Sequence, residues 1–342
     1  MTAAREGTER CPIAYYLAVD QGGTKTEAAV FTEQGRILGG GDDRDRRMPD
    51  ERYTQIQREM IGIAASRALD AAHLSLDQLS GACLALNGAD WPHEYPALAL
   101  MASDVLRLAV ERVTVINDCI GAMWAVREGG NRGVICAGTG LNCAVQRVGA
   151  PPFLYGYFIN DSDQGGSALG KAAFSAIIDA HNGLGPDTSL LDATLRHYAS
   201  ASLEALYMDI TAGRIDFKPK DLSPLLMSAA RGGDAVARRI LETTADRLAR
   251  YVLCGIEHVG IPGEPLTLVL SGGVFKGDGI CLEREIVCKL RARPEITVRQ
   301  ARMEPVVGTA RYMLRAVLGN ADERIDRNLE ETAEQFGCVR MG

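Results

Sequence analysis

The sequence contains no hydrophobic run long enough to span a bilayer, no dense block of lysine or arginine, and no Cys-x-x-Cys pair. The first absence argues against a transmembrane segment. The second, together with a formal net charge of −7, argues against a surface that binds nucleic acid or anionic membrane. The opening residues MTAAREGTERCPIAYY lack the apolar stretch and cleavage site of a signal peptide. These absences predict a cytoplasmic protein.

The nine cysteines are odd in number and scattered, and most lie in apolar runs such as GACLAL, GVICAG and YVLCGI. A reduced cysteine in such a run behaves as a small hydrophobic residue. The pattern therefore argues against a disulfide framework or a zinc site, and it fits a reducing compartment. The five histidines show no metal-ligand spacing.

A chain of 342 residues is too long for one ordinary hydrophobic core, so we expect two domains. Extended runs alternate with helical patterns, which predicts an α/β fold. In the first part the expected elements are strands 14–20, 27–32, 36–40, 80–86 and 112–117, and helices 51–72, 96–109 and one that begins at Asp118. In the second part they are a strand from 132 with a returning strand, a helix-rich stretch 167–258, strands 265–270 and 295–299, and helices 279–291 and 304–318. The charged tail that follows is compatible with a further helix.

Two segments of the chain repeat each other in outline. AVDQGGTKTEAAV and VICAGTGLNCAV each contain a strand, a turn of glycine and threonine, and a returning strand. This loose alignment predicts that the two domains share one structural device.

Three glycine turns directly follow apolar strands. The first glycine turn is Asp20–Thr26, the second is Gly138–Gly140 and the third is Ser271–Gly273. Glycine lets the backbone approach a ligand and turn its N–H groups toward it, while hydroxyl and lysine donors suit phosphate oxygens. Asp20 can hold Mg²⁺, usually through water. One such turn could be an ordinary polar hairpin, but three predict a nucleotide gripped between two domains.

Asp118 follows the strand VTVIN and opens a helix. Open α/β sheets place their ligands at the carboxyl ends of strands, where a carboxylate can accept a proton during phosphoryl transfer. An aspartate at this position can equally be the N-cap of the helix. The sequence leaves open whether Asp118 is a base, a cap or both.

The segment GGSALGKA, residues 165–172, matches the spacing of a P-loop, but Ala172 stands where Ser or Thr would hold Mg²⁺. We therefore reject a P-loop and expect these glycines to shape a turn that lets Asp163 face a substrate. No GxGxxG dinucleotide motif is present.

Four segments together resemble a known superfamily. LAVDQGGTKTEAAVF, VINDCIGA, GVICAGTGLNCAV and LVLSGGVF look like the phosphate-1, connect-1, phosphate-2 and adenosine motifs of the sugar kinase–Hsp70–actin superfamily. AARGGDAVARRILETTADRLA makes the chain most similar to the BadF/BadG/BcrA/BcrD group that includes N-acetylglucosamine kinase. The cysteine-rich zinc motif of the ROK sugar kinases is missing. The resemblance spans residues 14 to 318.

The resemblance implies an α/β fold with two ribonuclease H-like (actin-like ATPase) domains that face a nucleotide cleft. The N-terminal domain would be 12–119, completed by helix 304–330, and the C-terminal domain would be 120–303, with a helical insertion at 167–258. A homodimer is also implied by the resemblance alone.

The resemblance also implies a role for each matching residue. Asp118 would be the catalytic base and Asp20 would position Mg²⁺. The nucleotide would be bound by Gly22, Gly23, Thr24, Lys25, Gly138, Thr139, Gly140, Ala230, Gly272 and Gly273. The sugar would be bound by Asn87, Gly88, Asn142 and Asp163.

Two departures from the family pattern fall on the acceptor side. The segment GDDRDRRMPDERY, residues 41–53, is charged and contains no Asn where the hexosamine kinases bind the sugar. The Asp-Glu-Gly-Ser segment is altered to Asp163-Gln164-Gly165-Gly166, which makes Asp161 a rival for Asp163. The identity of the acceptor is thus open.

The first hypothesis is a kinase that uses ATP and Mg²⁺ to phosphorylate a hydroxyl of a sugar or amino sugar, with the glucosamines as models. A second is an ATPase that activates a dehydratase or reductase through an iron–sulfur cluster, although no cysteine set here forms a convincing cluster motif. A third is a sensor that binds nucleotide or sugar without turnover.

Overall fold

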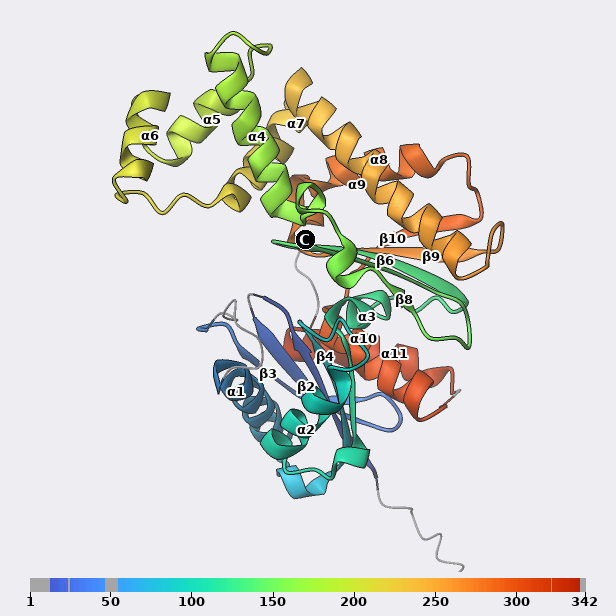
Figure 1. Cartoon of the computed structure of the whole chain (residues 1–342). Helices are drawn as coiled ribbons and strands as arrows, with labels where there is room; N and C mark the ends of the chain where they lie inside the picture. The colour runs from blue at the N-terminus through green and yellow to red at the C-terminus, as the bar shows by residue number, and fades with distance from the viewer. Residues whose placement is uncertain (1–12, 24, 47–54, 321, 339–342) are drawn as a thin grey trace, which may run out of the picture. The chain divides into compact units, whose positions relative to one another are not determined.

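The computed structural model describes residues 13–23, 25–46, 55–320 and 322–338. The chain divides into two compact units. Unit 1 holds the described residues up to Ala89, then His93–Ile116 and Thr309–Cys338, and unit 2 holds Asp90–Pro92 and Asn117–Gly308. Each unit contains one five-stranded sheet, and the elements of both are labelled in Figure 1.

The sheet of unit 1 has the strand order β3-β2-β1-β4-β5. Its strands are β1 (Tyr15–Gln21), β2 (Thr26–Thr32), β3 (Ile37–Asp43), β4 (Leu79–Leu86) and β5 (Val113–Asn117). Strands β1, β2 and β3 form an antiparallel meander, and β4 pairs parallel to β1. Its helices are α1 (Gln55–Ala72), α2 (Tyr95–Leu106) and α11 (Arg324–Ala333).

Helix α1 packs closely on β3 because two strand residues are glycines. A Cβ atom on Gly39 would lie 2.2 Å from the carbonyl oxygen of Ala68, and one on Gly41 would lie 2.5 Å from that of Ala64. The core beneath α1 and α2 contains Leu17, Val19, Val30, Leu84, Leu86, Leu98 and Ala102, among others. Strands β1, β2 and β4 are buried along most of their length, so continuous apolar runs mark them in the sequence.

The sheet of unit 2 has the order β10-β9-β6-β7-β8. Its strands are β6 (Asn131–Ala137), β7 (Leu141–Gln146), β8 (Phe153–Leu154), β9 (Leu266–Ser271) and β10 (Ile296–Gln300). Three strands again form an antiparallel meander, and β9 pairs parallel to β6 and to β10. Both sheets therefore have one topology, so the repeat predicted from the sequence is confirmed.

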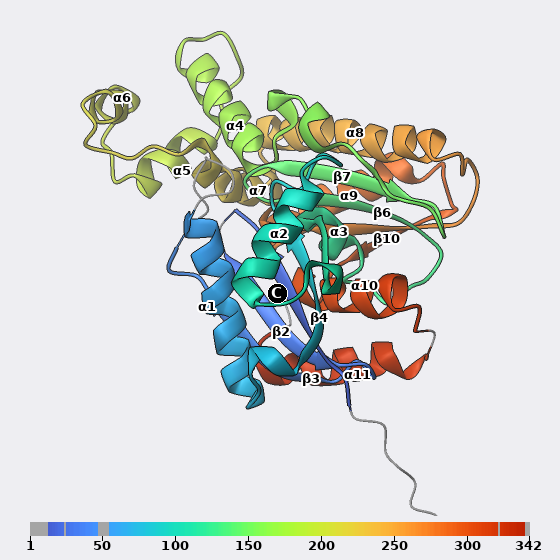
Figure 2. The same ribbon diagram turned by 60° about the horizontal axis from the view of Figure 1, so that its bottom comes forward.

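The helices of unit 2 are α3 (Asp118–Met123), α4 (Gly165–His181), α5 (Leu190–His197), α6 (Leu203–Thr211), α7 (Ser223–Arg231), α8 (Ala235–His258) and α9 (Ile280–Leu290). Figure 1 shows α8 and α9 on one face of the sheet and α3 on the other. Figure 2 shows α4 on the same side of the sheet as α8. The core between α8 and the sheet includes Ile135, Leu241, Leu248, Leu268 and Leu270.

Of the C-terminal part of the chain, Thr309–Cys338 belongs to unit 1, so the boundary between the units falls within α10. Helix α10 (Pro305–Tyr312) continues into a π-helical turn, Met313–Val317, which the sequence did not indicate. Arg311 is buried, and its Nε lies 2.7 Å from Oδ1 of Asp326 on α11. Arg315 reaches the other oxygen of Asp326 at 2.6 Å, so two arginines hold α11 in place.

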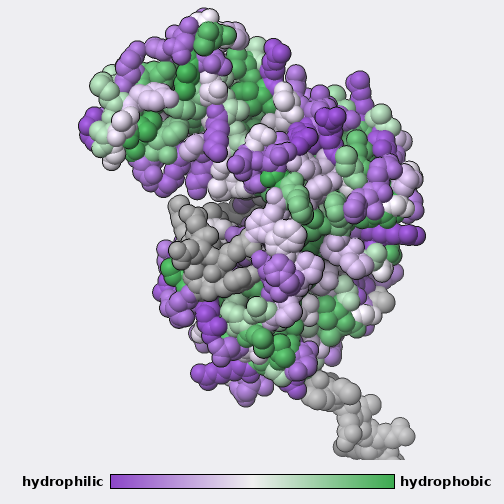
Figure 3. Space-filling view, viewed as in Figure 1, coloured by the Kyte–Doolittle hydropathy of each residue, from purple (hydrophilic) through white to green (hydrophobic). Residues whose placement is uncertain are grey.

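Within the described residues, none of the helices is both long and apolar enough to cross a membrane. On the face drawn in Figure 3, hydrophobic and hydrophilic side chains are mixed over the region that contains α4, α5 and α6. The exposed hydrophobic residues of this helical insertion include Leu184, Tyr207 and Met208.

Candidate active site

The second glycine turn is held from behind by the start of α4. Within the turn, the N–H of Gly138 donates to the carbonyl of Gly140 at 2.9 Å. From α4, Gly166 donates its N–H to the carbonyl of Gly138 at 2.8 Å, and Ser167 donates to that of Thr139 at 3.0 Å. Gly165 has φ +43°, and a Cβ atom there would lie 2.2 Å from the carbonyl oxygen of Gly140. The paired glycines thus permit a close backbone contact with the turn, whereas Gly170, the later glycine of the P-loop-like match, packs against the backbone of Pro219.

The third glycine turn packs against the second. Gly272 has φ +104°, and a Cβ atom on it would lie 2.1 Å from the carbonyl oxygen of Ala137, the last residue of β6. A Cβ atom on Gly273 would meet nothing within 4 Å. The structure thus brings together two of the turns predicted to hold the nucleotide, and it leaves the backbone at Gly273 open to a ligand.

Ala230 lies near the end of α7 and is buried. Its carbonyl oxygen accepts a hydrogen bond from Nε of Arg238 at 3.1 Å. The next residue, Arg231, forms an ion pair at 2.9 Å with Asp278, which follows the third glycine turn. Ala230 is therefore fixed beside the segment that carries Gly272 and Gly273.

Asp118 is the first residue of α3, and Asn117 is the N-cap, with its Oδ1 accepting from the N–H of Cys119 at 3.0 Å. The interpretation of Asp118 as the cap is therefore wrong. The reason is that Asn117 has the extended backbone of a cap residue while Asp118 is already helical. The carboxylate of Asp118 is thus not needed to cap the helix.

Three side chains form a hydrogen-bonded chain beside Asp118. Nδ2 of Asn117 donates to Oδ1 of Asp90 at 2.7 Å, and Nδ2 of Asn142 donates to Oδ1 of Asn117 at 3.2 Å. Oδ1 of Asn142 in turn accepts from the N–H of Gly156 at 3.1 Å. Asn142 therefore joins β7 to the helix start that presents Asp118.

The pKa of Asp118 is raised to about 7, mainly by desolvation of its carboxyl group, although the residue keeps partial exposure to solvent. The negative charge of Asp90 raises this pKa further, while N–H groups of Cys119 and of Asp118 itself lower it. A carboxyl group that titrates near neutrality can accept a proton at physiological pH and transfer it readily, which is what a general base requires.

An aromatic cluster lies next to this chain of polar groups. Trp91 stacks on Tyr157 with ring centroids 5.6 Å apart and meets the edge of Phe158 at 5.4 Å. Tyr157 and Phe158 are 46% and 73% exposed. Sequence reasoning missed Asp90 and these three aromatic residues. The available signal was the position of Trp91, one of two tryptophans in the chain, directly after the LALNGAD segment.

Asp163 is held by residues of α8. Its Oδ2 accepts from Nε of Arg247 at 2.8 Å and from the hydroxyl of Tyr251 at 2.7 Å. Asp161, its rival in the sequence, is exposed at the same short helical turn. Gln164 supports the second glycine turn, because its Oε1 accepts from the N–H of Leu141 at 3.1 Å. Asp163 thus has a fixed position, and one of its oxygens already has two donors.

In unit 1, few atoms of the described residues pack against the first glycine turn. The N–H of Gly22 donates to the carbonyl of Lys25 at 3.1 Å, and a Cβ atom on Gly22 would meet no atom within 4 Å among the described residues. A Cβ atom on Gly23 would lie 4.0 Å from Nδ2 of Asn87, and the N–H of Asn87 donates to the carbonyl of Gln21 at 2.9 Å. The structure thus places Asn87 beside this turn. Thr24 lies outside the described residues.

Charged side chains surround the first glycine turn. Asp20 is buried near the end of β1, and Nζ of Lys25 lies 2.8 Å from Oε1 of the buried Glu27. Gly88 has φ +90° with open space around it. No group of three His, Cys, Asp or Glu residues that could hold a metal ion occurs within the described ranges. Mg²⁺ that is bound mainly by phosphates and water needs only one or two carboxylates, so Asp20 fits that ion.

Comparison with known proteins settles the family. The model of the BadF/BadG/BcrA/BcrD ATPase family matches residues 17–312. The chain belongs to this family. The membership predicted from the four motifs is therefore confirmed.

Two curated relatives of this chain are named as sugar kinases. Glucosamine kinase GspK of Vibrio cholerae is 25% identical over 250 residues, covering 72% of this chain and 81% of the relative. N-acetylmuramic acid/N-acetylglucosamine kinase of Clostridium acetobutylicum is 24% identical over 268 residues, covering 76% and 85%.

Solved structures of sugar kinases share the fold. A candidate N-acetylglucosamine kinase from Chromobacterium violaceum has a TM-score of 0.65 at 18% identity, covering 88% of this chain and 99% of that one. A ROK family glucokinase from Streptomyces griseus, solved with glucose and AMPPNP, has a TM-score of 0.57 at 20% identity, covering 90% and 99%. The predicted fold class, α/β with two actin-like units, is confirmed.

Proposed function

We propose that this protein is an ATP-dependent kinase that transfers the γ-phosphate of ATP to a hydroxyl group of a sugar or amino sugar similar to glucosamine or N-acetylglucosamine. The observation that carries the proposal is Asp118, a carboxyl group with a pKa of about 7 that adjoins the fixed amides of Asn117 and Asn142. The names of the two curated relatives support the same substrate class.

Asp118 is the general base. Its carboxylate takes the proton of the acceptor hydroxyl as that oxygen attacks the γ-phosphorus, and the bond from phosphorus to the β-phosphate oxygen breaks to release ADP. In this reaction the protein mainly positions the reactants and stabilises charge. The hydrogen bonds of Asn117 to Cys119 and Asp90 keep the start of α3 in place for this step.

The nucleotide is bound by the glycine turns. The residues assigned to it are Gly22, Gly23, Thr24, Lys25, Gly138, Thr139, Gly140, Ala230, Gly272 and Gly273. The open space above Gly22 and Gly273 lets phosphate oxygens or the ribose approach the backbone. Asp20 holds Mg²⁺, which offsets the negative charge of the phosphates.

The acceptor is bound by Asn87, Gly88, Asn142 and Asp163, with Asp161 as the rival of Asp163. The second oxygen of Asp163 remains available for a sugar hydroxyl, because Arg247 and Tyr251 both bind Oδ2. Trp91 and Tyr157 provide an aromatic surface beside Asp118, and aromatic faces pack well against the apolar face of a sugar ring. We further infer that the protein is cytoplasmic and that it forms a homodimer. Sedimentation at micromolar concentration tests the homodimer.

The test is a coupled assay of ADP release with a panel of hexoses, hexosamines and N-acetylhexosamines. We expect at least one amino sugar to stimulate turnover strongly over the rate without sugar. ATP turnover that no sugar changes would argue against the kinase. Absorbance near 400 nm after anaerobic purification would then favour the activator ATPase.

A further inference from the structure

Unit 2 contains a cavity of about 700 Å³ between α4 and α8. One end of the cavity reaches Asp163, which we assign to the acceptor, and Ala137 and Leu141, which flank the second glycine turn. Its walls come from the α4 face that carries Ala168, Ala172 and Ala176 and from the α8 face that carries Val236 and Ile240. Val274 and Leu282 also line it. We call this cavity the α4–α8 groove. Pockets for small organic molecules have volumes of roughly 300–1,000 Å³ and mostly apolar walls, as this one has.

The groove exists because one wall has short side chains. Ala168, Ala172 and Ala176 recur every four residues, so they lie in a row along one face of α4. On α8 the hydroxyls of Thr243 and Thr244 donate back to the carbonyls of Arg239 and Ile240, both at 2.9 Å. These two hydroxyl protons are therefore bonded within α8 and are not offered to a ligand in the groove. The middle of the groove therefore suits an apolar body.

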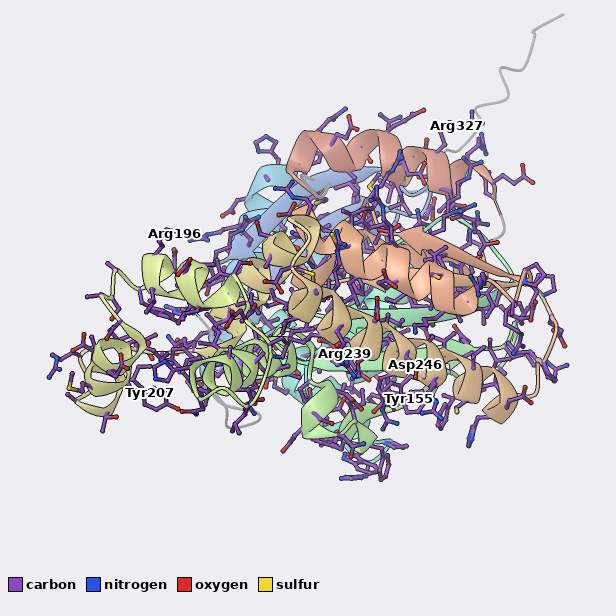
Figure 4. All side chains as sticks on the ribbon, turned by 90° about the horizontal axis from the view of Figure 1, so that it is seen from above. Tyr155, Arg196, Tyr207, Arg239, Asp246 and Arg327 are labelled. Carbon is purple, nitrogen blue, oxygen red and sulfur yellow. The ribbon has the colours of Figure 1, made fainter. Side chains whose placement is uncertain are left out.

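The charged groups that line the groove are not equivalent. At one end, Arg247 is paired with Asp163 at 2.8 Å. Arg239, two helical turns away on α8, also lines the groove and forms no ion pair with any residue that the structure describes. Figure 4 shows Arg239 on the side of α8 nearest α4. Asp179, at the other end of α4, is exposed at the rim.

We propose that the α4–α8 groove binds an amphiphilic carboxylate, with its apolar body along the alanine row of α4 and its acidic head on Arg239. A guanidinium group offers two parallel N–H donors, which match the two oxygens of a carboxylate. The alanine row from Ala168 to Ala176 extends for about 12 Å, because a helix rises about 1.5 Å per residue. A straight-chain fatty acid of medium length therefore has a suitable size.

The experiment is calorimetric titration of the full-length protein with decanoate, well below the concentration at which decanoate forms micelles. We expect saturable binding of one molecule per chain. Octanoate should bind about tenfold more weakly, since two fewer methylene groups are buried. Decan-1-ol, which has the same body without the charge, should also bind at least tenfold more weakly.

Variants assign the site. Arg239→Gln should weaken decanoate binding about tenfold and leave decan-1-ol binding unchanged. The control is Arg250→Gln, because Arg250 is exposed on α8 and lies outside the groove, and it should change the binding of neither ligand. Asp179→Asn should tighten decanoate binding severalfold, because it removes a negative charge from the rim. Ala172→Leu should fill the groove and block both ligands. Its melting temperature is the control for folding, and Ala176→Leu is the alternative if it melts early.

Two results would overturn the proposal. One is decanoate binding that Arg239→Gln and Ala172→Leu both leave unchanged, which would place the fatty acid elsewhere. The other is no saturable binding together with a dimer that Ala172→Leu dissociates, which would assign the groove to a second copy of the chain. Because binding is measured without ATP or sugar, neither result depends on the proposed kinase activity.

Discussion

The first and second glycine turns follow the first strand of their sheets, yet they are built differently. In unit 2, the turn Gly138–Gly140 contains no charged residue and is fixed by hydrogen bonds from Gly166 and Ser167. In unit 1, the turn after β1 lies among Asp20, Lys25 and Glu27, and within the described part of the chain no atom lies within 4 Å of a Cβ atom added to Gly22. The backbone of the turn in unit 2 is held by hydrogen bonds, whereas the turn in unit 1 has a less enclosed backbone and charged neighbours.

The difference indicates a division of labour between the repeats. A preorganised backbone turn can hold phosphate oxygens without first moving, because its N–H groups are already in place. A charged and open turn can accept Mg²⁺ and rearrange Lys25 from Glu27 to a phosphate. Under the proposed function, the repeat supplies a phosphate-binding turn with a fixed backbone in unit 2 and a turn that binds the metal ion in unit 1.

The largest expected effect is on Asp118 in unit 2. Asp118→Asn keeps the size of the side chain but removes the proton acceptor, so we expect sugar-dependent turnover to fall by about 10² to 10⁴-fold. The affinity for MgADP, measured by calorimetry, should change little. Asp70→Asn is the control, because Asp70 is exposed on α1 and has no role in the proposed site. Near-normal turnover of Asp118→Asn would remove this residue as the base and turn attention to Asp163.

The same variant should also change how the stability of the protein depends on pH. Because the pKa of Asp118 is raised to about 7 in the folded protein, its protonation stabilises the fold at low pH and this contribution is lost as the pH rises to 7. Asn cannot ionise. Asp118→Asn should therefore melt higher than the native protein at pH 8, and the gain should shrink toward pH 4.

The next largest effect tests the rigid turn of unit 2. Gly165→Ala forces a Cβ atom to within 2.2 Å of the carbonyl oxygen of Gly140 at a positive φ. We expect a loss of about 2–4 kcal/mol in the free energy of unfolding and a loss of nucleotide affinity of at least tenfold. Gly183→Ala is a matched control, since Gly183 has φ +69° but no atom within 4 Å of the added Cβ. It should cost about 1 kcal/mol and leave nucleotide binding intact.

These glycines mark the limit of what the sequence could predict. Hydrophobic patterning gave strand positions within a few residues, and the motif glycines located all three turns. Whether a glycine faces a ligand or a neighbouring backbone depends on residues far away in the chain, so Gly22 and Gly165 look alike in sequence. The same holds for Asp163, whose partners Arg247 and Tyr251 lie 84 and 88 residues later. The two-residue strand β8 was missed because so short a run carries no periodicity.

A smaller effect is expected from Asp90, which the sequence did not single out. Asp90→Asn removes a negative charge near Asp118 and keeps an oxygen for the amide of Asn117. The pKa of Asp118 should fall, though burial still holds it above that of an exposed aspartate. We expect the native enzyme to lose kcat/KM below about pH 7 and the variant to lose it about one pH unit lower. An unchanged acid limb would show that Asp90 does not act on the base.

The smallest effect on the fold is expected at Gly22, and it separates the two turns most directly. Gly22→Ala places a methyl group where no atom of the described residues lies within 4 Å. The free energy of unfolding without ligand should stay the same or rise by about 0.5 kcal/mol, because alanine restricts the unfolded chain. Affinity for MgADP should still fall by about threefold to tenfold, since the methyl group takes space that we assign to phosphate. Thermal melts with and without MgADP measure both quantities. If the variant keeps full nucleotide affinity, the space above Gly22 is not used by the nucleotide, and the role assigned to the open turn of unit 1 is wrong.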